Sequence, residues 1–286
     1  MTLCLDSPTA VFPVCDYDLS ATLTSGQAFG WRRVGEDWVG VIGRRWVRLR
    51  AETGTLIAQA AMLVFDWQWL TTYLQLDQDL EAVLETFPRD EPMCAAVRRC
   101  RGLRLLRQDP WECLASFIAS STKQIVQIQQ IVSLVCQRYG ESVAVAEGFA
   151  PAFAFPTPAR LAEATEAGLR ACKLGFRAPY LLKSARAIAQ GRPDLGRLAE
   201  MSVEEARAQL MELPGVGRKI ADCVLLFACG FQSAFPIDVW IMRALRELYF
   251  PRRRIGLARL HELAATHFGP NAGYAQQYLF HYMRTQ

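Results

Sequence analysis

The spacing of apolar and polar positions changes near residue 90 of this 286-residue chain. Before that point, short runs rich in Val, Trp and Phe alternate with polar residues and are separated by glycines, as at 22–34, 37–43 and 45–52. Such alternation is typical of antiparallel strands joined by tight turns. We therefore predict an N-terminal antiparallel sheet, and we place the five tryptophans between positions 31 and 69 in its core rather than on a base-stacking surface.

After residue 90 the apolar residues recur at the spacing of an α-helix. Helix starts are marked as well, because Asp109 precedes a proline at the first helical position and Ser202 forms a capping box with Glu205. The two patterns together predict an α+β fold. An antiparallel sheet domain at 1–88 precedes a mostly helical region at 89–286.

Composition narrows the class of protein. Hydrophobic residues make up 51% and charged residues 21% of the chain, which suits a packed core rather than disorder. The longest near-apolar run, 220–231, contains Asp222 and is shorter than the roughly 20 residues that span a membrane. Residues 1–20 lack a basic start followed by an apolar stretch, so we expect no secretion signal. A globular protein of the cytoplasm, without a membrane partner, is the expectation.

The net charge, the cysteines and the histidines do not indicate a particular reaction or ligand. Lys and Arg number 32 against 28 Asp and Glu, and the net charge of +4 permits a nucleic-acid partner without requiring one. The nine cysteines are scattered and the three histidines lie at no metal-ligand spacing, so we expect no metal site and no cofactor. Two arginine clusters are either solvated faces or contacts to phosphate groups. They consist of Arg98, Arg99, Arg101, Arg104 and Arg107, and of Arg243, Arg246, Arg252, Arg253, Arg254 and Arg259.

The most specific local feature is the sequence Leu-Pro-Gly-Val-Gly at 213–217. It lies between two helical patterns and predicts a helix-hairpin-helix at about 205–228, with Gly215, Val216 and Gly217 in the turn. Glycines let the backbone turn sharply and approach another molecule closely. The free N–H groups at the start of the second helix favour an anion, such as a phosphate of DNA. A simple corner between two helices is the alternative.

Lys219 and Asp238 are the candidates for chemistry. Lys219 lies in the first turn of the second hairpin helix, where the helix dipole disfavours a cation. Because only a free amine attacks an electrophile, this position suits a nucleophile, although a phosphate contact fits equally well. Asp238 is a predicted N-cap of the next helix and brings a carboxylate near the amine. Such a carboxylate can accept a proton and stabilise positive charge on a sugar ring.

The motif LPGVGRKIADC followed by FPID resembles the helix-hairpin-helix DNA glycosylases that carry a catalytic lysine. Four further stretches resemble the 8-oxoguanine DNA glycosylases specifically, and all five occur in the family's order over roughly residues 15–286. The four are TSGQAFGW, LRLLRQDPWECLASFIASS, KLGFRAPY and YAQQYLF. The resemblance implies double-stranded DNA containing oxidised guanine as the partner of a monomeric enzyme. It also implies a location with the genome, at the nucleoid of a bacterium or in a eukaryotic nucleus.

The resemblance implies a role for each matching residue. Lys219 attacks the sugar C1′ of a flipped nucleotide, expels the base and forms a Schiff base, with β-elimination as a following step, while Asp238 assists departure of the base.

Four further residues surround the base in the same family pattern. The oxidised guanine lies between Cys223 and Phe280, Gln276 reads its Watson–Crick edge, and the carbonyl of Gly26 accepts the N7 proton that normal guanine lacks.

The chain departs from the family where the opposite strand is recognised. Thr122 and Gln127 replace an Asn and an Arg that address the orphaned cytosine, whereas Arg177 is retained. Phe176 replaces a Tyr that wedges into the base stack, and Trp240 replaces a His that contacts a phosphate. We therefore predict looser discrimination of the opposite base.

Two alternatives remain beside an 8-oxoguanine glycosylase. One is a glycosylase of the same superfamily with another lesion preference. No cysteine follows Cys229, which disfavours the endonuclease III-like branch with its four-cysteine cluster, and Lys219 disfavours the alkylation-repair branch. The other is a non-enzymatic hairpin module that binds DNA. Such a module requires neither Lys219 with Asp238 nor Gln276 with Phe280.

Overall fold

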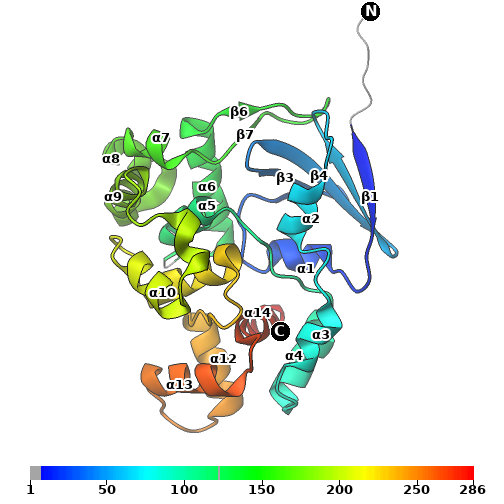
Figure 1. The fold of residues 1–286 in the computed structure, drawn as a ribbon, viewed down its shortest axis with the longest axis vertical. Helices are drawn as coiled ribbons and strands as arrows, with labels where there is room; N and C mark the ends of the chain where they lie inside the picture. The colour runs from blue at the N-terminus through cyan, green and yellow to red at the C-terminus, as the bar shows by residue number, and fades with distance from the viewer. Residues whose placement is uncertain (1–7, 122) are drawn as a thin grey trace, which may run out of the picture.

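The N-terminal part of the chain forms a five-stranded antiparallel sheet (Figure 1). The computed structural model describes residues 8–121 and 123–286. Strand order across the sheet is β1-β5-β4-β3-β2, so β2 to β5 form a meander and β1 pairs with β5 at its end. The strands are β1 (Thr9–Pro13), β2 (Arg32–Val34), β3 (Asp37–Ile42), β4 (Arg45–Glu52) and β5 (Thr55–Ala60).

Two-residue turns join the strands of the meander. Each turn contains a glycine in the left-handed region, with φ of 62° at Gly35, 60° at Gly43 and 70° at Gly54. Glycine adopts these angles without steric cost, so the chain can reverse direction within two residues. The predicted strands at 37–43 and 45–52 are thereby confirmed.

The predicted strand at 22–34 is wrong for most of its length. Helix α1 (Leu19–Thr24) begins after Asp18, whose side chain accepts a hydrogen bond from the Ala21 N–H at 2.8 Å. Only Arg32–Val34 pairs in the sheet. The capped helix start outweighs the alternation of apolar residues that follows it.

The remainder of the described chain is mostly helical, as predicted. None of its described helices combines the length and the apolar character that crossing a membrane requires. A short ribbon pairs β6 (Ser142–Val143) with β7 (Ala152–Phe153). The α-helices are α2 (Gln68–Leu74), α3 (Leu80–Glu85), α4 (Glu91–Cys100), α5 (Pro110–Ser120), α6 (Ile125–Tyr139), α7 (Pro158–Ala162), α8 (Glu166–Leu169), α9 (Ala178–Ala189), α10 (Val203–Met211), α11 (Arg218–Val224), α12 (Val239–Tyr249), α13 (Leu257–His267) and α14 (Ala272–Thr285).

The predicted helix starts are confirmed by their caps. Asp109 accepts a hydrogen bond from the Glu112 N–H at 2.8 Å, with a proline in the first turn of α5. Ser202 and Glu205 exchange hydrogen bonds of 3.3 and 3.0 Å at the start of α10. These caps satisfy N–H groups that have no partner inside a helix.

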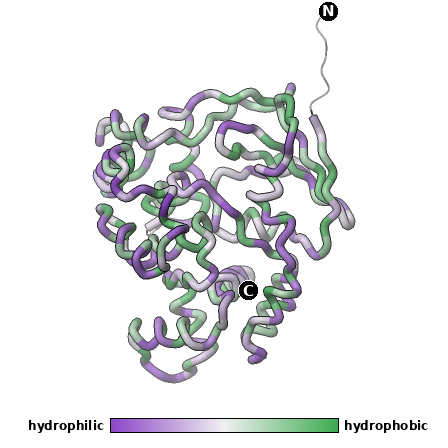
Figure 2. The backbone as a smooth tube through the Cα atoms, viewed as in Figure 1, coloured by the Kyte–Doolittle hydropathy of each residue, from purple (hydrophilic) through white to green (hydrophobic). Residues whose placement is uncertain are grey.

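Helix α5 lies at the centre of the helical region and is buried along its length from Trp111 to Ser120, apart from Glu112. It packs against α6, α9 and α11, which explains why its sequence is nearly continuously apolar. Two of the five sheet tryptophans, Trp31 and Trp46, are 3% and 2% exposed, so these two lie in the core as predicted. By contrast, the loop between α12 and α13 is hydrophilic (Figure 2).

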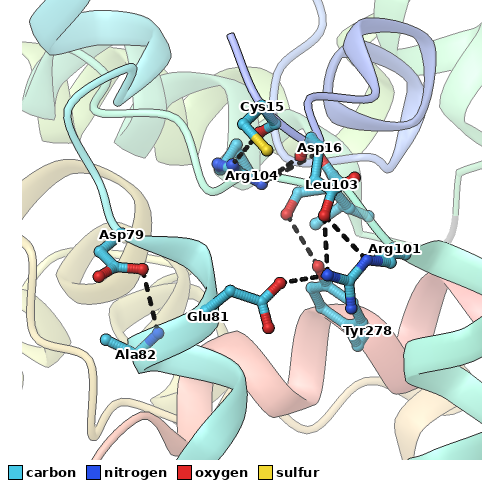
Figure 3. Close-up of polar contacts among 10 residues, drawn as sticks. Cys15, Asp16, Asp79, Glu81, Ala82, Arg101, Leu103, Arg104 and Tyr278 are labelled. Atoms are coloured by element: carbon cyan, nitrogen blue, oxygen red, sulfur yellow. Dashed lines mark hydrogen bonds and ion pairs between the residues drawn. The ribbon is translucent and has the colours of Figure 1, made fainter.

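Arginines of the first cluster connect the sheet region to the helices (Figure 3). Arg101 forms ion pairs with Asp16, at 2.7 Å, and with Glu81 of α3. Arg104 is 4% exposed and donates to the backbone oxygens of Asp16 and Cys15 at 2.8 and 3.2 Å. The buried Arg104 therefore serves internal contacts rather than a phosphate surface, whereas Arg101 is exposed and its charge is balanced by two acidic side chains.

Candidate active site

The hairpin turn between α10 and α11 uses its two glycines differently. Gly215 has φ of +79°, and a Cβ there would lie 2.8 Å from Cγ of Tyr180. Both the backbone angle and the close approach of Tyr180 therefore require glycine. A Cβ at Gly217 would meet no other described atom within 4 Å, so this residue leaves open space before α11. Val216 between them is 6% exposed and anchors the turn in the core.

Lys219 lies in the first turn of α11 with a half-buried side chain. Its Nζ is 4.8 Å from the ring centroid of Phe117 in the central helix α5. The charge of the amine also acts on Cys223, one turn further along α11. Cys223 is 3% exposed, and burial raises the pKa of its thiol to about 12, although the nearby Lys219 charge opposes that rise. The amine is thus held between an aromatic face and a neutral thiol.

Asp238 is the N-cap of α12, as predicted, and accepts a hydrogen bond from the Ile241 N–H at 2.8 Å. Burial raises the pKa of this carboxyl. The Ile241 N–H, the charge of Lys219, the Trp240 N–H and the charge of Arg284 act in the opposite direction. Asp238, at the start of α12, therefore lies within the electrostatic field of Lys219, at the start of α11.

Gly26 and Phe280 meet although they are far apart in the sequence. A Cβ at Gly26 would lie 3.3 Å from Cε1 of Phe280 and 2.7 Å from Cδ1 of Ile125. Gln276 precedes Phe280 by one helical turn of α14 and shares its face. Gln276 is 3% exposed, and its Oε1 has no hydrogen-bond partner within the described part of the chain. A buried acceptor of this kind is costly unless a ligand satisfies it.

Comparison with known proteins identifies the family that has this arrangement. Residues 11–114 match the N-terminal domain of 8-oxoguanine DNA glycosylases. Residues 115–265 match the HhH-GPD superfamily of base excision DNA repair proteins. The chain belongs to the 8-oxoguanine DNA glycosylases.

Relatives of this glycosylase align over most of its length. It is 32% identical to a probable N-glycosylase/DNA lyase of Methanothermobacter thermautotrophicus, over 95% of both chains. It is 30% identical to the N-glycosylase/DNA lyase OGG1 of Arabidopsis thaliana, over 92% of this chain and 76% of that protein. The solved structure of a Clostridium acetobutylicum 8-oxoguanine glycosylase/lyase, in complex with double-stranded DNA containing cytosine opposite 8-oxoguanine, superposes with a TM-score of 0.89. The identity there is 28%, over 98% of this chain and 99% of that chain.

Two glutamines that the sequence analysis missed fix the Gly26 loop of the glycosylase. The Gln277 amide of α14 donates to the Ser25 carbonyl at 2.9 Å. Gln27 is fully buried; its amide donates to the Arg104 carbonyl at 2.8 Å, and its side-chain oxygen accepts from the Leu106 N–H at 2.8 Å. Both glutamines lie in motifs that carry the family resemblance, and their buried amides form hydrogen bonds that hold the Gly26 loop in one conformation.

Phe117 and Arg284 were missed as well. Phe117 looked like one more apolar position of α5, and nothing in its spacing marks the Lys219 contact. Arg284 ends the apolar pattern of α14 and looked like a basic residue favoured by the helix C-terminus.

Arg177 and Phe176 form a stacked pair at the start of α9. The Arg177 guanidinium carbon lies 4.3 Å from the ring centroid of Phe176. Phe176 is 58% exposed whereas Arg177 is 2% exposed, so the ring covers the guanidinium. Burial also lowers the pKa of Arg177.

Three further positions were predicted to contact DNA. Thr122 and Gln127 are those predicted to face the opposite strand, and Trp240 stands at the position of a phosphate contact. Thr122 lies outside the described residues. The Gln127 side-chain oxygen accepts a hydrogen bond from the Gln124 N–H at 3.1 Å and thereby caps α6. Trp240 is 37% exposed in the first turn of α12, beside Asp238.

Proposed function

We propose that this glycosylase removes 8-oxoguanine from duplex DNA and then cleaves the abasic strand, with Lys219 as its nucleophile. The observation that carries the proposal is the half-buried Lys219 amine, which is held against Phe117 and Cys223 within the field of Asp238. A hairpin module that only binds DNA needs no amine beside a carboxylate in such a site. The names of the relatives, N-glycosylase/DNA lyase, support both activities.

In the excision step, the free amine of Lys219 attacks C1′ of a nucleotide that has flipped out of the duplex. The bond between C1′ and N9 breaks, and its electron pair leaves with the base. Positive charge develops on the sugar ring during this step, as it does when other glycosidic bonds break. The ionised Asp238 carboxylate stabilises that charge while the bond breaks, and it accepts the proton of the alkylated amine after the base has left.

In the lyase step, the Lys219 nitrogen and the opened sugar form a Schiff base. The positive nitrogen draws electrons from C1′, so a proton leaves C2′ and the C3′–O bond breaks by β-elimination. One amine therefore serves both steps of the reaction.

Base recognition rests on the residues around Gly26. The Gly26 carbonyl accepts the N7 proton of 8-oxoguanine, and normal guanine leaves that acceptor unpaired at a cost of roughly 1–3 kcal/mol. The buried Gln276 side chain pairs with the Watson–Crick edge and gives its oxygen the missing partner. Cys223 and Phe280 supply the two apolar faces between which the base lies.

Contacts to the DNA outside the base pocket are part of the same proposal. Gly215 and Gly217 of the hairpin present backbone N–H groups to a phosphate, whereas the Val216 N–H donates to the Leu213 carbonyl at 3.1 Å and holds the turn between them. Phe176 fills the space left by the flipped nucleotide, and Arg177 beneath it addresses the orphaned base. Because the Gln127 oxygen is engaged in capping α6, we propose that recognition of the opposite base is loose.

We further propose that the chain has two domains, acts as a monomer and works at the genome. A boundary near residue 88 separates the sheet domain at 1–88 from the helical region at 89–286. The enzyme works as a monomer, as the family resemblance implies. It works where the genome is, at a bacterial nucleoid or in a eukaryotic nucleus, because its substrate is duplex DNA.

Borohydride trapping tests the nucleophile directly. Reduction of the Schiff base must link the native protein covalently to a duplex containing 8-oxoguanine, whereas Lys219→Gln must give neither the link nor released base. Lys183→Gln is the matched control, because Lys183 is an exposed lysine on α9. Release of 8-oxoguanine by Lys219→Gln at the native rate would remove the assignment.

A further inference from the structure

Arg284 lies behind the proposed base pocket. It is in the last turn of α14, four residues after Phe280, so both side chains share one helix face. The Arg284 guanidinium carbon lies 5.3 Å from the ring centroid of Phe280. That distance is within the range at which a cation is attracted to the face of an aromatic ring.

The same side chain is coupled to Asp238 on α12. Burial lowers the pKa of Arg284, and the negative charge of Asp238 opposes that change. The charge of Arg284 in turn lowers the pKa of Asp238. Arginine stays charged under these conditions, since its ordinary pKa is far above neutrality. The guanidinium is thus half-buried against an aromatic ring and lies within the electrostatic field of a carboxylate on the helix that packs against α14.

We propose that Arg284 is a positioning residue of the active site, which holds the Phe280 ring in place and keeps Asp238 ionised while Lys219 reacts. The inference rests on the proposed function of Lys219 and Asp238 and adds a group that acts through both the base pocket and the carboxylate.

The chemistry explains why a second cation is needed. Burial raises the pKa of Asp238, so burial alone favours the neutral acid, which cannot stabilise positive charge on the sugar. Lys219 opposes this effect only while it is protonated, and it must lose its proton in order to attack. At that moment Arg284 is the cation that remains beside Asp238.

Four groups enter the pH dependence of this site. Lys219 and Cys223 face Asp238 from α11, and Arg284 faces it from α14. His281, also on α14, lies within the field of Arg284; burial first and then Arg284 lower its pKa. Any test must therefore separate Asp238 from His281.

The test is the pH profile of single-turnover excision at saturating enzyme. Arg284→Gln must move the acid limb upward by up to about one pH unit, because it removes one of the charges that lower the pKa of Asp238. On the acid side of the limb the rate must therefore fall by up to about tenfold relative to the native protein. Arg284→Lys retains the charge and must restore the native limb. Its weaker hold on the Phe280 ring must still reduce the preference for 8-oxoguanine over guanine in binding.

Control variants test whether the shift of the acid limb is specific to Arg284. Arg160→Gln removes an exposed arginine of α7 that pairs with Glu163 at 3.3 Å, and it must leave the profile unchanged. The double variant H281N/R284Q must show the same shifted limb as R284Q, which excludes His281 as its source. Thermal melting identifies any variant that has lost its fold.

Two results would overturn the inference. One is a native profile for R284Q in a folded protein; the other is an equal loss for R284Q and R284K at every pH, which would indicate packing alone. Borohydride trapping by the native protein tests Lys219 independently, so failure of the Arg284 inference would leave the proposed function standing.

Discussion

Replacing Gly26 by alanine perturbs the base pocket at one defined point. Gly26 has φ of +78°, an angle that side-chain-bearing residues rarely adopt. The added Cβ would lie 2.7 Å from Cδ1 of Ile125 and 3.3 Å from Cε1 of Phe280. The Ile125 atom is the end of a flexible side chain and can rotate away. The Phe280 ring must move by a few tenths of an ångström.

The size of the effect follows from the backbone strain at position 26 and from the displacement of the Phe280 ring. Left-handed backbone at a non-glycine residue costs about 1–2 kcal/mol of stability. For a chain of this size, that corresponds to a fall in Tm of about 2–3 °C. Displacement of the ring adds a separate loss, because small misplacements at a reacting site reduce rates strongly, and we expect kcat/KM for 8-oxoguanine excision to fall about tenfold.

The variant Gly148→Ala separates the effect of backbone strain from the effect of displacing the Phe280 ring. Gly148 has φ of +83°, and a Cβ there would meet no atom of the described residues within 4 Å. It therefore carries the same backbone strain without touching the pocket. Melting curves must show a similar fall in Tm for both variants, whereas the excision assay must show a loss for Gly26→Ala alone. Equal excision rates for the two variants would refute the assignment of Gly26 to the base pocket.

Three further predictions concern charge and strand recognition. Asp238→Asn keeps a good N-cap but removes the charge, so excision must fall about 10²–10³-fold while Tm stays nearly constant; native turnover would exclude the electrostatic role. Burial raises the pKa of Glu112 from 4.5 to about 8, so the folded state binds more protons than the unfolded state in that range, and the free energy of unfolding must fall as pH rises through it. Urea unfolding at several pH values must show a flatter dependence for Glu112→Gln, and an equally steep one would contradict the burial of this carboxyl. Duplexes with 8-oxoguanine opposite each of the four bases must be cleaved at rates within about tenfold of one another, as weak hydrogen-bond readout implies, and a strong preference for cytosine would contradict loose recognition.

Local signals predicted the parts of the fold that local interactions determine. The capping residues Asp109, Ser202 and Asp238 each start a helix, because a side-chain oxygen next to free N–H groups is a short-range arrangement. The strand predicted at 22–34 failed for the same reason, since the cap at Asp18 starts a helix that the alternating pattern conceals.

The candidate site was predictable only in part. Lys219 and Asp238 lie on two helices that follow each other in the sequence, so their proximity could be argued from the chain itself. Contacts between distant segments carried no local signal, and the Gly26 to Phe280 contact came only from the family resemblance. Arg284 shows the remaining difficulty, because an arginine at a helix end is ordinary until the packing of α12 against α14 places it beside a carboxylate.

The hydrogen bond from Gln277 to the Ser25 carbonyl joins residues that are 252 positions apart. During translation, the amine of Lys219 and the carboxylate of Asp238 leave the ribosome before α14 does. A nascent chain therefore contains the proposed reactive groups before it contains the proposed base pocket, because α14 supplies both Phe280 and the anchor of the Gly26 loop. Under the proposed roles, selection of the damaged base depends on a helix that is synthesised after both reactive groups.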